Sequence, residues 1–288
     1  QGLGLVVNFG LYALLVSYAP PPVDYPLVAL CIATSVSLFV NFTALAKFVF
    51  PRKHHETHYM QEQYSGTDNL EVMADAINYN EFLVSLIVGQ ARPATNIVDF
   101  GAGIGTFAAI CVQRGLQVHC VEADARQCEE ISKLGIPVSR SLEDLADGSV
   151  DLIFTLNVLE HIEDDQAVLR DMRRKLKPGG RLLVYVPAFQ VLFSSMDRKV
   201  GHYRRYTRQE LAHKAGGAGF AIITNRYVDS LGFMAALLYK LIGSDSGSIN
   251  RRSLLIYDRL VFPVSRVLDR VLGSLVGKNV YLVAERPD

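Results

Sequence analysis

A glycine-rich loop between a short apolar run and a helical pattern constrains the fold of this chain more than any other feature. The run Val98–Phe100 is followed by Gly101–Gly105, in which every second residue is glycine, and then by a helical pattern from Thr106. Glycines let the backbone approach a ligand closely, and a helix N-terminus offers unpaired N–H groups to an anion. In dinucleotide-binding proteins the third glycine stands one place later, so this spacing disfavours a nicotinamide-dependent oxidoreductase. Asp99, just before the loop, suits a ligand that carries an ammonium group.

Strand and helix patterns alternate along most of the chain. They predict strands at 97–100, 118–122, 136–138, 150–155, 181–186, 220–227 and 280–284, and helices at 70–89, 106–114, 125–133, 163–176 and 208–218. Such alternation is typical of parallel sheets with helices on both faces. We therefore expect an α/β fold with a doubly wound, seven-stranded, mostly parallel sheet.

Three further motifs follow the glycine loop. Glu122 ends the second predicted strand, where a carboxylate can accept hydrogen bonds from both ribose hydroxyls of an adenosine-type ligand. Asn157–His161 (NVLEH) follows the fourth strand, at the carboxyl edge where ligands of such sheets bind, and Leu176–Gly180 (LKPGG) precedes the fifth. Together with the loop at Asp99–Gly105, these motifs resemble the class I S-adenosylmethionine-dependent methyltransferases over residues 96–220.

This resemblance implies that the cofactor is S-adenosyl-L-methionine. The glycine loop would cradle its methionine end, and Glu122 would hold the ribose. Ser141 and Leu142 would flank the adenine, while Asn157 and Leu159 would line the wall near the sulfonium. The implied cofactor-binding residues are Asp99, Gly101, Ala102, Gly103, Gly105, Glu122, Ala123, Ser141, Leu142, Asn157 and Leu159. No metal ligand is expected, since the histidines at 54, 55 and 58 have no supporting cysteine or second cluster.

A polar loop after the fifth strand supplies candidate catalytic residues. Gly201–Thr207 (GHYRRYT) resembles the substrate-side loop of methyltransferases often encoded among cell-envelope sugar enzymes. Its histidine, tyrosines and arginines could bind a phosphate or carboxylate and supply a base. We take His202, Tyr203 and His161 as the candidate catalytic residues. Two alternatives stay open: His161 could orient its own loop, and the arginines could be solvated.

The first fifty residues are almost free of charge, with only Asp24 and Lys47. Two apolar runs, 3–18 and 25–50, flank a turn that contains three consecutive prolines. A bilayer core requires about 20 helical residues, and the basic residues after position 50 favour the cytoplasmic side. We expect a two-helix transmembrane hairpin at 1–50, a juxtamembrane linker at 51–69 and a methyltransferase domain at 70–288. A buried helical hairpin is the alternative.

The same N-terminal region resembles part of the GtrA-like membrane family. The resemblance rests on Val7–Tyr12 (VNFGLY), Asn41–Phe42 and Phe48–Phe50 (FVF). That family is associated with polyprenyl-linked sugars and usually carries four spans, of which two are visible here. It implies a polyprenyl-linked sugar as a substrate and a glycosyltransferase as a partner. Because the chain begins with Gln1, we also expect the natural protein to extend further at this end.

Charge and cysteine usage exclude some classes of partner. The 29 basic residues balance the 29 acidic ones, so nothing indicates a nucleic-acid partner. The four cysteines, without a CxxC pair, are expected to be free thiols in a reducing compartment. A helical insert at about 229–278 carries an apolar pattern with interleaved arginines. It suits an interfacial helix on anionic lipid, a lid over the sheet, or both.

These patterns together predict a membrane-anchored methyltransferase whose catalytic domain is cytoplasmic. We expect it to contact the lipid bilayer and to O-methylate a lipid-linked saccharide or another membrane-proximal cell-envelope substrate. A quinone or another lipid is an alternative acceptor. A second alternative is a non-catalytic, cofactor-binding membrane subunit in glycan assembly.

Overall fold

The computed structural model describes residues 2–30, 32–34, 36, 37, 40, 75–91, 95–242 and 251–288. The chain separates into two compact units, residues 1–59 and 60–288, and each is described by itself.

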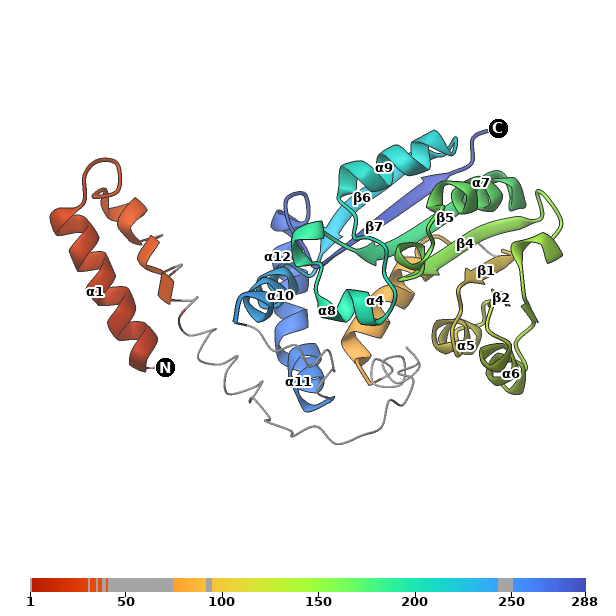
Figure 1. Ribbon diagram of the computed structural model, residues 1–288, viewed down its shortest axis with the longest axis horizontal. Helices are drawn as coiled ribbons and strands as arrows, with labels where there is room; N and C mark the ends of the chain where they lie inside the picture. Colours follow the sequence, from red (N-terminus) through yellow and green to blue (C-terminus); the bar gives the residue numbers. More distant parts are fainter. Residues whose placement is uncertain are drawn as a thin grey trace. The chain divides into compact units, whose positions relative to one another are not determined.

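The N-terminal unit contains a helix, a proline turn and a second helical segment. Helix α1 (Gly2–Tyr18) has 17 residues, and after the turn the chain runs back beside it (Figure 1). In the second segment Ala29, Ala33 and Ser37, spaced by four, are buried. Within the described part of the chain, no helix combines the length and the apolarity needed to cross a membrane.

The predicted transmembrane hairpin is therefore not supported. The 17 residues of α1 span about 26 Å, which is less than the roughly 30 Å of a bilayer core. The linker predicted at 51–69 and the GtrA-like pairs at 41–42 and 48–50 lie outside the described residues.

The larger unit is built on a seven-stranded sheet with the order β3-β2-β1-β4-β5-β7-β6. Strands β1 to β5 are parallel, and β7 is antiparallel to both β5 and β6. This confirms the prediction of a seven-stranded, mostly parallel sheet. The strands are β1 (Ile97–Phe100), β2 (Val118–Val121), β3 (Val138–Ser139), β4 (Val150–Leu156), β5 (Leu176–Pro187), β6 (Ala221–Val228) and β7 (Asn279–Glu285).

Helices cover both faces of this sheet, as Figure 1 shows. One face carries α4 (Ile77–Val88), α5 (Thr106–Gln113) and α6 (Ala125–Lys133), and the other carries α7 (Asp165–Lys175) and α9 (Arg208–Gly217). Helix α9 begins with a capping box formed by Thr207 and Glu210.

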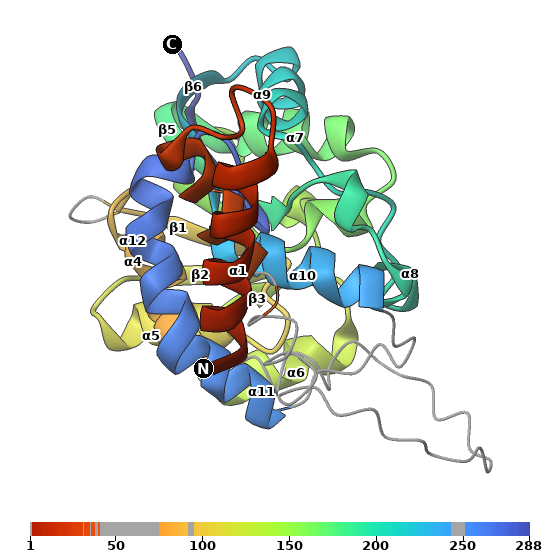
Figure 2. The ribbon, with the colours of Figure 1, turned by 90° about the vertical axis from the view of Figure 1, so that its left-hand side faces the viewer.

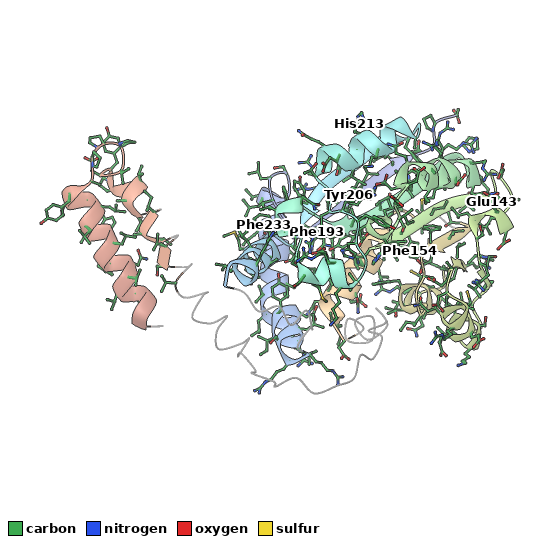
Figure 3. The ribbon with its side chains drawn as sticks, viewed as in Figure 1. Glu143, Phe154, Phe193, Tyr206, His213 and Phe233 are labelled. Atoms are coloured by element: carbon green, nitrogen blue, oxygen red, sulfur yellow. The ribbon has the colours of Figure 1, made fainter. Side chains whose placement is uncertain are left out.

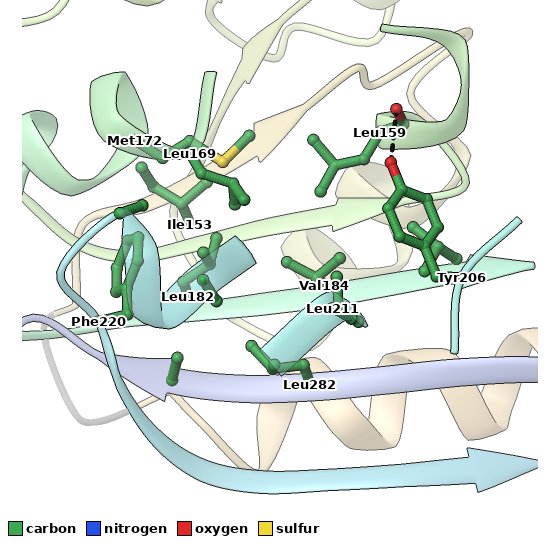
Figure 4. Packing of buried hydrophobic residues seen from close by; sticks show 14 of the residues in the cluster. Ile153, Leu159, Leu169, Met172, Leu182, Val184, Tyr206, Leu211, Phe220 and Leu282 are labelled. Carbon is green, nitrogen blue, oxygen red and sulfur yellow. Dashed lines mark hydrogen bonds between the residues drawn. The ribbon is translucent and has the colours of Figure 1, made fainter. Parts of the chain in front are cut away.

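Successive strand side chains point to opposite faces, so a strand covered on both sides is apolar throughout. In β4, Ile153 packs toward α7 and α9, while Leu152 and Phe154 pack toward α4 and α5. Figure 4 shows the apolar cluster on the α7 and α9 face, which includes Ile153, Leu182 and Met172 of α7. The sheet thus lies between two buried apolar layers.

The predicted helical insert is present between β6 and β7. It consists of α10 (Ser230–Ile242), α11 (Arg251–Ile256), the π-helical turn η4 (Tyr257–Val261) and α12 (Phe262–Leu272). Figure 2 shows α11 and α12 following each other as one nearly continuous rod. The insert leaves the sheet after Val228 and returns at Asn279, which pairs with both Val228 and Pro187. It therefore lies at the carboxyl edge of the parallel strands.

Buried carboxylates fasten this insert to the rest of the domain. Asp258 accepts hydrogen bonds from the backbone N–H groups of Asn78 (3.0 Å) and Tyr79 (2.8 Å), at the start of α4. Asp269 accepts bonds from the backbone N–H groups of Asp229 and Ser230, at 2.8 and 2.9 Å. Because α4 and β6 are both held in this way, the insert has a fixed place beside the sheet.

Candidate functional site

The loop between β1 and α5 can take its shape only with glycine. Gly101, Gly103 and Gly105 have φ values of 75°, 58° and 80°, in the left-handed region that glycine occupies without strain. A Cβ on Gly101 would lie 2.4 Å from Cγ2 of Val158, in the loop after β4. The chain therefore brings two backbone loops into direct contact at the carboxyl edge.

Glu122, the predicted ribose ligand, lies against this loop. Its carboxylate accepts hydrogen bonds from the backbone N–H of Gly103 (2.8 Å) and from that of Asp124 (2.9 Å). Asp124 in turn caps α6, because its side chain accepts bonds from Arg126 and Gln127. Each Glu122 oxygen has a second lone pair, so the carboxylate can still accept bonds from two ribose hydroxyls.

Asp99 lies beneath the loop as an incompletely paired buried carboxylate. Its side chain is 3% exposed, and its Oδ2 has no hydrogen-bond partner among the described residues. Burial, with the nearby Glu122 charge, raises the pKa of Asp99 well above its usual range. A ligand that brings an ammonium group here would satisfy this carboxylate, and the methionine end of S-adenosylmethionine carries one. The residues present thus fit this cofactor.

The remaining predicted cofactor residues lie in loops at the same edge. Ser141 caps the short 3-10 turn η1 (Leu142–Asp144), and Ala123, in the loop after β2, is exposed. Leu142 and Leu159 are 6% and 1% exposed and belong to the core. Leu159 is predicted to line the cofactor wall, but its side chain instead packs inside the α7 and α9 layer.

Asn157 has an unusual backbone conformation directly after β4. Its φ is 56°, and its N–H donates to the carbonyl of Tyr185 at 2.7 Å. Left-handed φ values are uncommon for residues other than glycine and concentrate at functional sites. This conformation turns the chain at the edge of the sheet, beside the glycine loop.

The fold brings the two predicted histidines together with a carboxylate that was not assigned a role. The rings of His161 and His202 meet edge to face, with centroids 4.5 Å apart. Nε2 of His202 lies 3.9 Å from Oε1 of Glu160, which is completely buried. Burial raises the pKa of Glu160 to about 8. His161 is an exposed residue, but partial desolvation of its ring and the neighbouring imidazole lower its pKa to about 4.

Asp197, which is not among the residues predicted from the sequence, holds His202 in place. Its Oδ1 lies 2.8 Å from Nδ1 of His202, and it accepts two bonds from Arg205, at 2.8 and 3.0 Å. Burial alone would raise the pKa of Asp197, but the bonds from His202 and Arg205 lower it below its usual range. One sequence feature could have pointed to Asp197. It stands three residues after Ser194, and the two residues form a capping box at the start of α8 (Ser195–Lys199).

A second buried carboxylate, Asp165, fixes the other half of the loop. It forms ion pairs with Arg204 (2.9 Å) and Lys214 (2.7 Å), and its Oδ2 lies 2.8 Å from the Tyr206 hydroxyl. The same hydroxyl lies 3.1 Å from the Leu159 carbonyl, as Figure 4 shows. Arg204 and Arg205 are thus paired with aspartates, which answers the question of whether they are solvated.

Tyr203 is placed differently from the two histidines. Its side chain is 54% exposed, while its backbone N–H donates to the carbonyl of Glu160 at 2.8 Å. This bond joins the loop after β4 to the predicted substrate loop, while the tyrosine ring itself faces solvent.

Residues 57–225 match the family model described as a methyltransferase domain. The chain belongs to this family. An uncharacterized methyltransferase of Mycobacterium sp. (strain KMS) is 30% identical over 125 residues, which cover 39% of this chain and 50% of that protein. A ubiquinone biosynthesis O-methyltransferase of Xanthomonas oryzae pv. oryzae (strain PXO99A) is 32% identical over 99 residues, or 31% and 41% of the two chains. This methyltransferase chain therefore spans about half the length of the curated relatives it matches.

Among solved structures, phosphoethanolamine N-methyltransferase 2 of Haemonchus contortus, in complex with S-adenosyl-L-methionine, has the same fold. The TM-score is 0.52 at 20% identity, over 79% of this chain and 59% of that one. Family membership confirms the predicted S-adenosylmethionine-dependent methyltransferase domain and its cofactor. The family match begins at residue 57, so it gives no support to the GtrA-like resemblance of residues 1–50.

Proposed function

We propose that this methyltransferase transfers a methyl group to an oxygen atom of a lipid-borne acceptor at a membrane surface. S-Adenosylmethionine, when bound, supplies a methyl group on an electrophilic sulfonium. Asp99 and Glu122 would hold its ammonium group and its ribose, and the glycine loop would lie along its methionine end. The other task of the protein is to place an acceptor oxygen at the carboxyl edge and to promote loss of its proton.

The observation that carries this proposal is an exposed apolar stripe on the insert. Successive turns of η4, α12 and the residues after it present apolar side chains that are 53–77% exposed, namely Leu260, Val264, Val267, Val271 and Leu275. Single exposed apolar residues are ordinary, but a continuous stripe along one helix face marks an interaction surface.

The charges on this insert suit an anionic lipid surface. Along 251–272, which the structure describes completely, Asp258 and Asp269 are the two acidic residues, and both are buried. The exposed charges are those of Arg251, Arg252, Arg259 and Arg270. An apolar stripe flanked by cations is the pattern of a helix that lies in the interface of an anionic membrane.

The insert that carries this apolar stripe lies at the edge of the sheet where the predicted cofactor-binding residues are found. The insert enters and leaves the sheet at the end of β5, the same edge that carries the glycine loop and Glu160. Phe193 and Phe233, labelled in Figure 3, mark where the loop after β5 and α10 come together. A lipid headgroup held beside the insert would therefore lie at the same edge of the sheet as the cofactor loop.

Two acceptor classes fit this arrangement. A polyprenyl-linked saccharide offers hydroxyl groups on a lipid carrier, and a glycosyltransferase would be the natural partner for such a substrate at the cytoplasmic face of a membrane. A quinone precursor is the second candidate, because one of the matched relatives is named as a ubiquinone biosynthesis O-methyltransferase.

The experiment combines vesicle binding with methyl transfer. The full chain should float with vesicles that contain phosphatidylglycerol and not with pure phosphatidylcholine, and binding should weaken as salt screens the arginines. Val271→Glu should abolish flotation, whereas Val112→Glu, at a 44% exposed valine on α5, should not.

Methyl transfer is then measured with labelled S-adenosylmethionine and two acceptor pools from bacterial envelopes, a lipid extract and an aqueous extract. We expect the label in the lipid pool, with base-stable attachment to oxygen. Methylation confined to the aqueous pool, without any effect of Val271→Glu, would refute the proposal.

A further inference from the structure

Glu160, His161 and His202 form a cluster whose side chains converge. Glu160 and His161 lie in the 3-10 turn η2 (Leu159–His161) after β4, and His202 lies in the loop that follows α8. One potential ligand atom from each residue lies within 4.8 Å of the other two. Two of these atoms, Nε2 of His202 and Oε1 of Glu160, are 3.9 Å apart.

One of the two histidines is already oriented through its other ring nitrogen. Nδ1 of His202 lies 2.8 Å from Asp197, whose carboxylate can only accept, so this nitrogen carries a proton and a neutral His202 presents a lone pair on Nε2. The His161 ring packs edge to face against the His202 ring. A metal-binding histidine nearly always has such an outer partner, which fixes its tautomer and its orientation.

Glu160 supplies an independent observation that points to a ligand. Its side chain is 0% exposed, and neither carboxylate oxygen has a hydrogen-bond partner within the described structure. The guanidinium of Arg205, which could have paired with it, is bound to Asp197. A buried carboxyl group without a hydrogen-bond partner is costly, and a bound cation would pair with its ionised form.

We propose that Glu160, His161 and His202 bind a divalent metal ion of the zinc type. Two imidazoles and one carboxylate are the ligand set of catalytic zinc sites that keep an open position. Nitrogen and oxygen ligands lie about 2.0–2.2 Å from zinc, and therefore roughly 3.3 Å from each other in a tetrahedral site. The three ligand atoms lie within 4.8 Å of one another, and small side-chain rotations would bring them to the distance that a tetrahedral site requires.

The open fourth position would allow the ion to bind the methyl acceptor, a role that rests on the proposed function. An acceptor hydroxyl bound there would have a lowered pKa, and its proton would pass to solvent. The acceptor oxygen would then use its lone pair to bond the methyl carbon, while the electron pair of the C–S bond stays on sulfur. In this arrangement His161 and His202 are ligands and not general bases.

The test begins with zinc alone and uses the full chain without an affinity tag. After treatment with EDTA and dialysis, Zn²⁺ is titrated into the protein by calorimetry, and bound metal is counted by mass spectrometry. We expect one ion per chain, and a dissociation constant that rises at least about 100-fold in Glu160→Gln and in His202→Ala. Asp197→Asn, which removes the outer partner of His202, should weaken binding by about 10–100-fold.

Two controls separate this site from other histidines. His213→Ala, on α9 and labelled in Figure 3, should bind zinc like the unaltered chain. Replacement of His54, His55 and His58 by alanine should also leave one ion bound. Circular dichroism and S-adenosylmethionine titration of Glu160→Gln show whether that variant is folded. Zinc binding that survives Glu160→Gln and His202→Ala, or no stoichiometric binding to the folded chain, would overturn the proposal.

A separate readout distinguishes the metal site from the proposed function. Methylation of the lipid extract is measured with and without chelator, after which Zn²⁺ is restored. Loss and recovery of activity support the use of the ion in acceptor activation. Full activity with the chelator would overturn that use and leave the proposed function intact. Bound zinc without methylation of any lipid acceptor would refute the proposed function alone.

Discussion

Replacement of Gly101 by alanine should displace the cofactor loop through a collision with Val158. The added Cβ would lie 2.4 Å from one methyl carbon of Val158 and 2.7 Å from the other. Val158 is followed by the buried residues Leu159 and Glu160, so it cannot simply move outward. The backbone at Gly101 also has a φ of 75°, which strains any other residue.

The size of the effect follows from two terms. A left-handed backbone costs an L-residue about 1–2 kcal/mol, and an extra carbon forced into a packed region costs about 1–3 kcal/mol. Reduced freedom of the unfolded chain offsets about 0.4–1 kcal/mol of this. We therefore expect Gly101→Ala to lower the free energy of unfolding by about 1–4.5 kcal/mol.

Gly115 provides a matched control within the same domain. It has a φ of 82°, and a Cβ there would meet nothing within 4 Å. Gly115→Ala should therefore cost about 1 kcal/mol, from backbone strain alone. The difference between the two variants isolates the collision, and Val158→Ala in the Gly101→Ala background should recover most of that difference.

Urea unfolding followed by circular dichroism measures the stabilities, and calorimetry measures S-adenosylmethionine binding. Gly101→Ala should bind the cofactor much more weakly, whereas Gly115→Ala should bind it normally. The reasoning is refuted if the two variants are equally stable, or if Val158→Ala recovers nothing.

Three further predictions concern carboxylates. Glu122→Ala should weaken S-adenosylmethionine binding about 10–100-fold, because hydrogen bonds to a charged group contribute about 1.5–3 kcal/mol. An unchanged affinity in calorimetry would contradict this. The raised pKa of Asp99 makes the folded state bind more protons than the unfolded one above about pH 4, so this group lowers stability as pH rises. Asp99→Asn should thus be more stable than the unaltered protein at pH 7, by a margin that shrinks toward pH 4, and should bind S-adenosylmethionine more weakly. Asp165→Ala should cost about 3–5 kcal/mol, because Arg204 and Lys214 lose their buried partner, whereas Glu163→Ala at an exposed position should cost less than about 0.5 kcal/mol in the same thermal unfolding assay.

Local signals were enough to predict the sheet and the cofactor loop. Apolar runs alternate with helical periodicity because the strands are covered on both faces, and the glycine spacing reflects backbone angles that other residues cannot adopt. The position of Glu122 followed from the order of strand, loop and helix. These features depend on neighbours within a few residues, so the sequence alone determined them.

Long-range packing changed several local expectations. Strand β5 begins at Leu176 and not at Arg181, because Leu176 pairs with Val150 on β4. Leu159 is in the core and not on a cofactor wall, because α7 and α9 cover it. The membrane hairpin was inferred from apolar length and is a separate case: no described helix is long and apolar enough to span a membrane, and residues 41–50 of the second predicted run lie outside the described residues.

The cluster of Glu160, His161 and His202 was decided by the tertiary structure. The sequence places two of these residues side by side and the third about 40 positions later, and it does not show that Asp197 orients His202. Only the fold brings the loop after β4 against the loop after α8 and leaves the Glu160 carboxylate buried, with no hydrogen-bond partner among the residues that the structure describes. Local sequence patterns reflect the backbone angles and the buried face of each segment. A site built from separate loops depends instead on the order of the strands in the sheet, which local patterns do not show.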